Sequence, residues 1–216
     1  MRLGILGGTF DPIHLGHLLM AETALDGLGL SQVLFVPAGD PPHKQDLAKT
    51  PARHRVAMVE RAIAGHSCFA MSRVDLERPG PHYTTDTVRL IRRQCQLSAE
   101  ACFLIVGGDS LVDLPTWHHA PELARLCRLA VAHRPEYRPD LAELEAVIPG
   151  LNTRLDWVEM PLIGVSASDI RARVRAGRSI RYQVAEPVRE YIEQHQLYFT
   201  FRKHKIDNRP DEKSGR

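Results

Sequence analysis

Residues 7 to 17 read Gly-Gly-Thr-Phe-Asp-Pro-Ile-His-Leu-Gly-His. They follow the apolar run from Leu3 to Leu6 and precede a stretch of helical periodicity that begins at Leu18. An apolar run that ends in glycines is typical of a buried parallel strand, and periodic apolar residues indicate a helix. The stretch is therefore predicted to form a turn between a strand and a helix. Because the first turn of a helix exposes unpaired N–H groups, this turn is a candidate phosphate site.

The turn lacks the usual phosphate-binding patterns, since its glycine spacing gives neither a P-loop nor a dinucleotide-binding fingerprint. His14 and His17 instead offer imidazole N–H donors, and Gly7 and Gly8 allow a phosphate to approach the backbone closely. Two histidines three residues apart can also ligate a metal. No third and fourth ligand of suitable type lies nearby in the sequence, so no protein-held metal is expected.

Short apolar runs alternate with helical patterns along the chain. The predicted strands are 2–6, 32–37, 68–71, 101–106, 126–132 and 154–159. The predicted helices are 18–28, 51–64, 84–96, 121–125, 140–147, 168–176 and 186–196. This alternation is typical of an α/β fold with a parallel sheet, in which ligands bind beyond the carboxyl ends of the strands, where the strand order reverses.

The length of 216 residues suits one domain. We expect that domain to span residues 1–202, with a helical part from about 166, and we expect the polar stretch 203–216 to be a mobile tail. A formal net charge of +2 does not favour nucleic-acid or membrane binding. The 4 cysteines form no Cys-x-x-Cys pair, and no signal peptide or long apolar span occurs, so reduced thiols and a cytoplasmic location are expected.

A second glycine pair, Gly107-Gly108, follows the predicted strand 101–106 and is itself followed by Asp109. Two neighbouring strands that both end in glycine leave space for a nucleotide across the sheet edge. Asp109 is then placed to accept hydrogen bonds from a ribose hydroxyl. The alternative is that Asp109 caps the next helix, and the two roles are compatible.

The third motif is Ser166-Ala-Ser168-Asp169-Ile-Arg171, which opens a predicted helix. Ser168 is the expected N-cap, and Asp169 suits the first turn of that helix. Ser166, Ser168, Arg171 and the free N–H groups of the helix start would form a cradle for the outer phosphates of ATP.

The three motifs together resemble the nucleotidyltransferase superfamily with the (H/T)xGH signature, whose form Gly-x-Phe-Asp-Pro-x-His-x-Gly-His is matched from Gly8 to His17. Further segments resemble the bacterial nicotinate mononucleotide adenylyltransferases, and the resemblance runs from Arg2 to about Tyr198. These segments are 41–44, 82–87, 115–118 and 177–182, together with Val188, Tyr191, Ile192, Leu197 and Tyr198.

The resemblance implies a Rossmann-like, doubly wound sheet with C-terminal helices. It also implies transfer of the adenylyl group of ATP to nicotinate mononucleotide in NAD biosynthesis, with Mg²⁺ carried in by ATP. His14, His17 and Arg171 would be the catalytic residues. The implied ATP-binding residues are Gly7, Gly8, Thr9, Phe10, His17, Gly107, Asp109, Ser166, Ser168 and Arg171. The implied mononucleotide-binding residues are Lys44, Thr84, Thr85, Asp109 and Trp117, with His118 where relatives commonly carry Tyr.

Two other functions are compatible with parts of the sequence. An adenylyltransferase for nicotinamide mononucleotide or phosphopantetheine would share the histidine turn, but we expect it to lack the segments around Tyr83-Thr84 and Trp117. A non-enzymatic nucleotide-binding regulator would tolerate loss of His17 or Arg171, and both residues are present.

Overall fold

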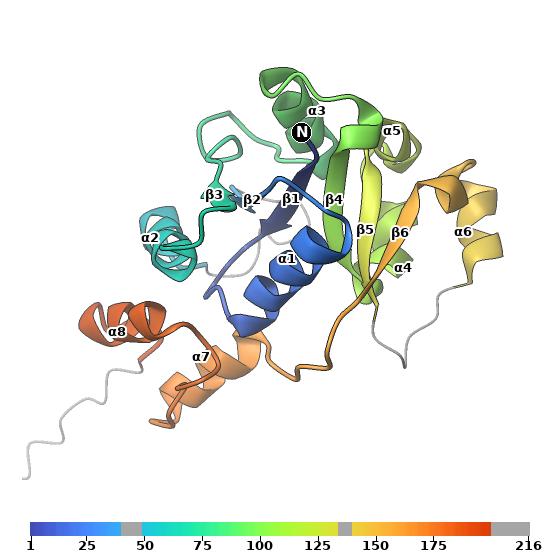
Figure 1. Ribbon diagram of the computed structural model, residues 1–216. Helices are drawn as coiled ribbons and strands as arrows, with labels where there is room; N and C mark the ends of the chain where they lie inside the picture. The colour runs from blue at the N-terminus through green and yellow to red at the C-terminus, as the bar shows by residue number, and fades with distance from the viewer. Residues whose placement is uncertain (40–48, 134–139, 200–216) are drawn as a thin grey trace, which may run out of the picture.

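The computed structural model describes residues 1–39, 49–133 and 140–199 (Figure 1). Its centre is a six-stranded parallel sheet of order β3-β2-β1-β4-β5-β6. The strands are β1 (Leu3–Gly8), β2 (Gln32–Pro37), β3 (Phe69–Met71), β4 (Cys102–Gly107), β5 (Arg128–His133) and β6 (Leu155–Glu159). All six predicted strands and the predicted α/β doubly wound sheet are thus confirmed.

Eight α-helices connect or flank the strands within the described residues. They are α1 (Leu15–Gly27), α2 (Ala52–Ile63), α3 (Thr84–Gln94), α4 (Gly108–Asp113), α5 (Ala120–Leu126), α6 (Leu141–Val147), α7 (Ala167–Arg175) and α8 (Glu186–Gln194). Short 3-10 turns occur at η2 (Ala99–Ala101), η3 (Leu114–Thr116) and η4 (Leu151–Arg154).

The largest differences from the sequence prediction concern two helices. Helix α1 begins at Leu15, three residues before the predicted start. The prediction missed its first turn because that turn carries Gly16 and His17 rather than periodic apolar residues. Helix α4 was missed, since its 6 residues are too few to establish a helical period.

The strand order reverses between β1 and β4. Strand β1 pairs with β2 from Leu3 to Gly8 on one side and with β4 from Leu3 to Ile5 on the other. The chain therefore moves outward from β1 to β3 and returns to β4, which brings the carboxyl ends of β1 and β4 together. This is the position at which open α/β sheets bind ligands. The first two glycine motifs both lie there.

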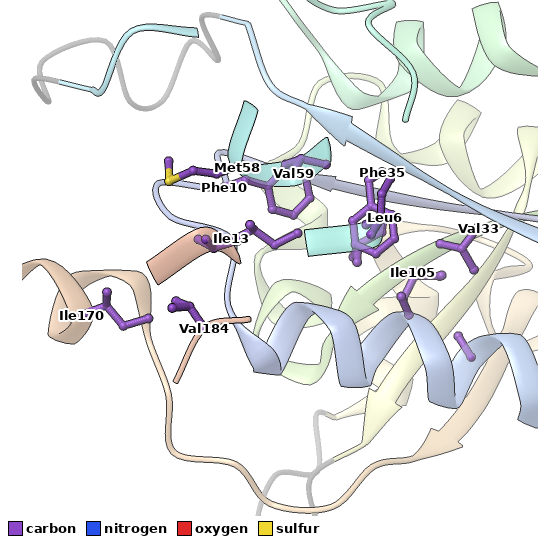
Figure 2. Packing of buried hydrophobic residues seen from close by; sticks show 14 of the residues in the cluster. Leu6, Phe10, Ile13, Val33, Phe35, Met58, Val59, Ile105, Ile170 and Val184 are labelled. Atoms are coloured by element: carbon purple, nitrogen blue, oxygen red, sulfur yellow. The ribbon is translucent and has the colours of Figure 1, made fainter. Parts of the chain in front are cut away.

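Two hydrophobic clusters cover the two faces of the sheet. One contains Leu6, Phe10 and Ile13 together with Ile170 and Val184 from the C-terminal part (Figure 2). The other contains the remaining inward side chains of the sheet and those of α3 and α5, among them Leu3, Ile5, Leu104, Val88 and Leu123. Alternate strand residues point to opposite faces, which explains this division. The first cluster also ties α7 and α8 to the loop after β1.

Some predictions fall outside the described part of the chain. Lys44 lies there, and so does the predicted tail 203–216. The single domain over residues 1–202 stays a prediction. Across the described ranges, the structure contains no helix with both the length and the apolar character that a membrane span requires.

Candidate active site

Strand β1 ends with two glycines that have different roles. A Cβ atom added at Gly8 would lie 2.8 Å from the ring of Phe10, so only glycine fits there. A Cβ atom added at Gly7 would meet nothing within 4 Å, and Gly7 is exposed. Gly8 therefore serves internal packing, while Gly7 leaves open space at the sheet edge.

Phe10 anchors this loop in the core. Its side chain is 1% exposed, and its φ of 50° lies in the left-handed region that non-glycine residues seldom adopt. The ring meets the imidazole of His17 edge to face, with centroids 5.0 Å apart and planes at 82°. A buried ring thus fixes one side of His17.

His14 and His17 are brought together by the start of α1. His14 is the N-cap residue, and His17 follows in the first turn. Their rings stack with centroids 3.7 Å apart and planes at 26°. A Cβ atom at Gly16 would lie 3.0 Å from Nδ1 of His14, so Gly16 gives the His14 ring its space.

Both imidazoles are neutral at pH 7. Burial lowers the pKa of His14 to about 4. Burial, together with the charge that His14 would carry, lowers the pKa of His17 to about 3. Nδ1 of His17 accepts the backbone N–H of His14 at 3.2 Å, so the single ring proton of His17 is on Nε2.

The His14 ring takes the same tautomer. The start of α1 has the arrangement of a capping box, in which the His14 side chain faces the backbone N–H of His17, but among the described residues no hydrogen bond of normal geometry reaches its buried Nδ1 atom. A buried N–H without a partner is rarer than a buried lone pair without one, so the proton belongs on Nε2. The pair therefore presents two neutral N–H donors rather than cations or general bases.

Arg171 of α7 reaches the same loop. Its Nη1 donates to the carbonyl of Asp11 at 2.6 Å, and its Nη2 donates to the hydroxyl of Ser168 at 3.4 Å. Ser166 is the N-cap, because its hydroxyl accepts the N–H of Asp169 at 3.1 Å. The prediction that Ser168 caps this helix is therefore wrong: α7 starts one residue earlier than predicted.

The loop has supports that the sequence analysis missed. Arg55 of α2, which is 3% exposed, donates to the carbonyl of Thr9 at 2.8 Å and to that of Thr50 at 3.0 Å. The carboxylate of Asp11 accepts the N–H of Thr50 at 3.1 Å and the hydroxyl of Tyr198 at 2.6 Å. The available signal was Arg55 itself, a cation directly before the apolar residues of α2.

The second glycine motif ends β4 and opens α4. Gly107 is the N-cap, and Asp109 is an exposed residue of the first turn. The alternative role of Asp109 as the cap of this helix is therefore wrong. A Cβ atom at Gly107 would lie 2.4 Å from Oδ1 of Asp109, so glycine is required for this carboxylate position. The ribose role of Asp109 stays a prediction.

Residues predicted to bind the mononucleotide meet at the start of α3. Thr84 and Thr85 form its first turn, after the N-cap Tyr83. The buried hydroxyl of Thr85 donates to the carbonyl of His118 at 2.8 Å, which joins α3 to the segment after η3. The Tyr83 and His118 rings stack at 3.9 Å with planes at 22°. Half-buried Trp117 immediately precedes His118 and packs against the second cluster.

A local polar network, also missed from the sequence, supports the start of α3. The buried carboxylate of Asp75 accepts the hydroxyl of Thr87 at 2.7 Å and Nη2 of Arg78 at 3.0 Å. Arg78 also donates to the carbonyls of Pro81 at 3.1 Å and Tyr83 at 3.4 Å. The segment before α3 is thus fixed by side chains close to it in sequence.

Potential metal ligands do not gather at this site. Within residues 1–39, 49–133 and 140–199, no three His, Cys, Asp or Glu side chains come together in a way that could hold a metal ion. His14 and His17 stack face to face, with ring centroids 3.7 Å apart.

Comparisons with known proteins place these features in a family. The chain matches the cytidylyltransferase-like family model over residues 5–173. It is 53% identical over 199 residues to a probable nicotinate-nucleotide adenylyltransferase of Thermomicrobium roseum, covering 92% of both chains. It is 44% identical over 196 residues to a protein of the same description from Roseiflexus sp., covering 91% of this chain and 97% of the relative.

Solved structures share the fold. The nicotinic acid mononucleotide adenylyltransferase of Plasmodium falciparum, complexed with NaAD, superposes with a TM-score of 0.73 at 19% identity. The match covers 93% of this chain and 99% of that one. The same enzyme complexed with APC gives a TM-score of 0.73 at 18% identity. At such identities the likeness concerns the fold alone.

Proposed function

The chain belongs to the nicotinate-nucleotide adenylyltransferases of the cytidylyltransferase-like family, and from this premise we propose which of its residues carry the activity. The protein transfers the adenylyl group of ATP to the phosphate of nicotinate mononucleotide, which gives nicotinic acid adenine dinucleotide and pyrophosphate in NAD biosynthesis. The observation that supports the assignment of roles best is the pair of stacked, neutral imidazoles at the start of α1.

The reaction needs donors more than it needs a base. A phosphate oxygen of the mononucleotide attacks the α-phosphorus of ATP, a new P–O bond forms, and the bond to the leaving pyrophosphate breaks. Because the attacking phosphate is already anionic at neutral pH, no side chain has to remove a proton from it. Catalysis then rests on alignment and on stabilising the charge that develops on the phosphates.

We assign the donor role to His14 and His17. Each neutral ring presents its Nε2–H, and the buried Phe10 ring and the start of α1 hold His17 in place. Arg171 would bind the outer phosphates, with Ser166 and Ser168 beside it at the start of α7. Gly7, Gly8, Thr9 and Phe10 would form the backbone surface for ATP, and Gly107 and Asp109 the surface for a ribose.

The mononucleotide would bind between α3 and the segment that follows η3. Free N–H groups at Thr84 and Thr85 suit the carboxylate of nicotinate, and Trp117 suits stacking on the pyridine ring. A site built from N–H donors binds a carboxylate well because both of its oxygens accept hydrogen bonds. An amide has an NH₂ group in place of one oxygen, so some of the N–H groups of the site would lose their acceptor. We therefore expect a preference for nicotinate over nicotinamide mononucleotide. Lys44, outside the described residues, is our candidate for the phosphate of this substrate.

We propose that the divalent metal used with ATP is Mg²⁺ and that it enters with the nucleotide. Mg²⁺ keeps several water ligands and is commonly held by substrate phosphates, where it neutralises charge during transfer. We also propose a cytoplasmic location. All 4 cysteines, Cys68, Cys95, Cys102 and Cys127, are free, which is the usual state in a reducing compartment.

The test is pyrophosphate release from ATP and Mg²⁺ with three acceptors in parallel: nicotinate mononucleotide, nicotinamide mononucleotide and phosphopantetheine. Mass spectrometry identifies each product. We expect the dinucleotide to form mainly from the nicotinate substrate. Release with another acceptor would contradict the substrate assignment, and ATP binding without release would indicate a regulator instead of an enzyme.

A further inference from the structure

The C-terminal segment reaches the loop that carries the histidines. Tyr198 follows α8, and its hydroxyl donates to Oδ1 of Asp11 at 2.6 Å across a separation of 187 residues. Asp11 is 7% exposed, so this carboxylate depends on protein donors for its hydrogen bonds. Tyr198 supplies one donor and the N–H of Thr50 supplies another, at 3.1 Å to Oδ2.

The backbone at Tyr198 is held in an uncommon conformation. Its φ is 69°, in the left-handed region, and Gln196 just before it has a φ of 51°. Such conformations persist in bulky residues only where the surroundings impose them. Leu197 closes the end of α8 by donating to the carbonyl of Ile192 at 3.0 Å, which turns the chain back toward α2 and the loop. The conformation of Gln196 belongs to this helix end, as that of Gln96 does after α3, whereas the left-handed Tyr198 is the residue whose hydroxyl bonds Asp11.

The phenol is a permanent donor in this position. Burial and the adjacent Asp11 carboxylate raise the pKa of Tyr198 above its ordinary value. The hydroxyl therefore keeps its proton throughout the physiological range, and Asp11 receives the same hydrogen bond at every such pH.

Asp11 connects this contact to the reacting groups. Its backbone carbonyl accepts Nη1 of Arg171 at 2.6 Å, and its neighbour Phe10 packs edge to face on His17 at 5.0 Å. A displacement of Asp11 would therefore move both the guanidinium proposed to hold ATP and the imidazole proposed as a donor.

We propose that Tyr198 is a positioning residue for adenylyl transfer: through Asp11 it holds the loop between β1 and α1 in the geometry in which His17 and Arg171 act together. This inference rests on the proposed function. Tyr198 acts through the carboxylate and touches no reacting atom, so its loss should lower turnover more than it weakens substrate binding.

The central variant is Tyr198→Phe, which removes only the hydroxyl. Its matched control is Tyr191→Phe, because the hydroxyl of Tyr191 in α8 also makes a hydrogen bond, at 2.9 Å to Nδ1 of His54 in α2 rather than to the loop. We expect kcat to fall roughly tenfold in Tyr198→Phe, with each KM within about twofold of the wild type. In Tyr191→Phe we expect kcat to stay within about twofold, even where the melting temperatures of the two variants fall equally. Equal kcat values in the two variants would overturn the proposal.

A double-mutant cycle tests whether Asp11 is the intermediary. In an Asp11→Ala background the added Tyr198→Phe change should alter kcat less than about twofold, because its partner is already absent. A further tenfold loss there would show that Tyr198 acts by another route.

A measurement without substrate separates this inference from the proposed function. With ¹³C-labelled histidine, the ring signals of His14 and His17 should shift or broaden in Tyr198→Phe and stay in place in Tyr191→Phe. Unchanged His14 and His17 signals in Tyr198→Phe would overturn the positioning role whether or not the wild type forms a dinucleotide. A wild type that forms none would contradict the proposed function alone.

Discussion

The histidine loop and the start of α3 are fixed in opposite ways. The loop from Thr9 to Pro12 is held by hydrogen bonds to residues 39, 46, 160 and 187 positions away. The start of α3 is held by bonds between residues 3 to 12 positions apart, within the network of Asp75, Arg78 and Thr87. Longer links among the described residues are the bond from Thr85 to His118, across 33 positions, and the stack of Tyr83 on His118.

This difference matches the two tasks proposed for the regions. Groups that stabilise developing charge must be held within fractions of an ångström, and distant elements that converge on one loop provide that rigidity. A recognition surface that is held by local contacts can accept a substitution with little effect on the structure of distant elements. The network of Asp75, Arg78 and Thr87 is such a place, because its hydrogen bonds stay within the segment before α3 and the first turns of that helix.

The largest expected effect is on the chemistry of the loop. His17→Ala should lower kcat by about 10²–10³-fold, because it removes a donor that acts on developing charge, while the affinity for nicotinate mononucleotide changes little. Steady-state kinetics and direct binding of the mononucleotide measure the two quantities. The control is His66→Ala, whose ring stacks on Phe69 of the edge strand β3 at 3.8 Å. An unaltered kcat in His17→Ala would remove this residue from the mechanism.

The glycine pair sharpens the comparison within the loop. Gly8→Ala should lower the free energy of unfolding by roughly 2 to 3 kcal/mol, since the new methyl group would lie 2.8 Å from the Phe10 ring. Gly7→Ala should leave stability unchanged, because its methyl group meets nothing within 4 Å, but it should raise the KM for ATP. Urea unfolding and ATP kinetics distinguish the two variants. Equal unfolding free energies for the two variants would show that the Phe10 ring shifts to accommodate a methyl group at position 8 without a cost in stability.

Buried neutral histidines make the loop sensitive to acid. The pKa of His17 is about 3 in the folded protein, against 6.5 for an unperturbed histidine. Below pH 6.5 the unfolded state binds more protons, so the contribution of His17 to stability is complete above pH 6.5 and is lost as the pH falls toward 3. At pH 5 the loss is about 2 kcal/mol.

The variant His17→Asn measures this contribution. The difference in unfolding free energy between pH 7 and pH 5 should shrink by about 2 kcal/mol relative to the wild type. An unchanged difference would mean that the pKa of His17 in the folded protein lies near its ordinary value of 6.5, which would contradict burial of the ring in its neutral form.

The smallest expected effect is on recognition. Trp117→Ala should raise the KM for nicotinate mononucleotide about tenfold and leave kcat within about twofold, because stacking on the pyridine ring is made equally before and during reaction. The control is Trp157→Ala on the edge strand β6, with 43% of Trp157 exposed. A fall in kcat as large as that of His17→Ala would abolish the distinction between the two regions.

The amino-acid sequence alone determined the order of the elements and where the chemistry lies. Short apolar runs located all six strands and 3.6-residue periods located seven of the eight described helices. Strands of a parallel sheet are buried on both faces and are apolar throughout, whereas a helix that buries one face is periodic. The glycine and histidine pattern located the candidate phosphate loop. Close approach of a ligand to glycine backbone and the free N–H groups of a helix's first turn both depend on residues that are adjacent in the sequence.

Only the tertiary structure decided what holds that loop in place. The contacts of Asp11 with Thr50 and Tyr198, and that of Arg55 with Thr9, join segments whose separation leaves no periodic trace in the sequence. The stacking of His14 on His17 and the depth of their burial likewise arise from the packing of Phe10 and Gly16 around them. The burial of both rings depends on the whole fold. Their lowered pKa values, and therefore their neutral state, follow from the tertiary structure and not from the local sequence.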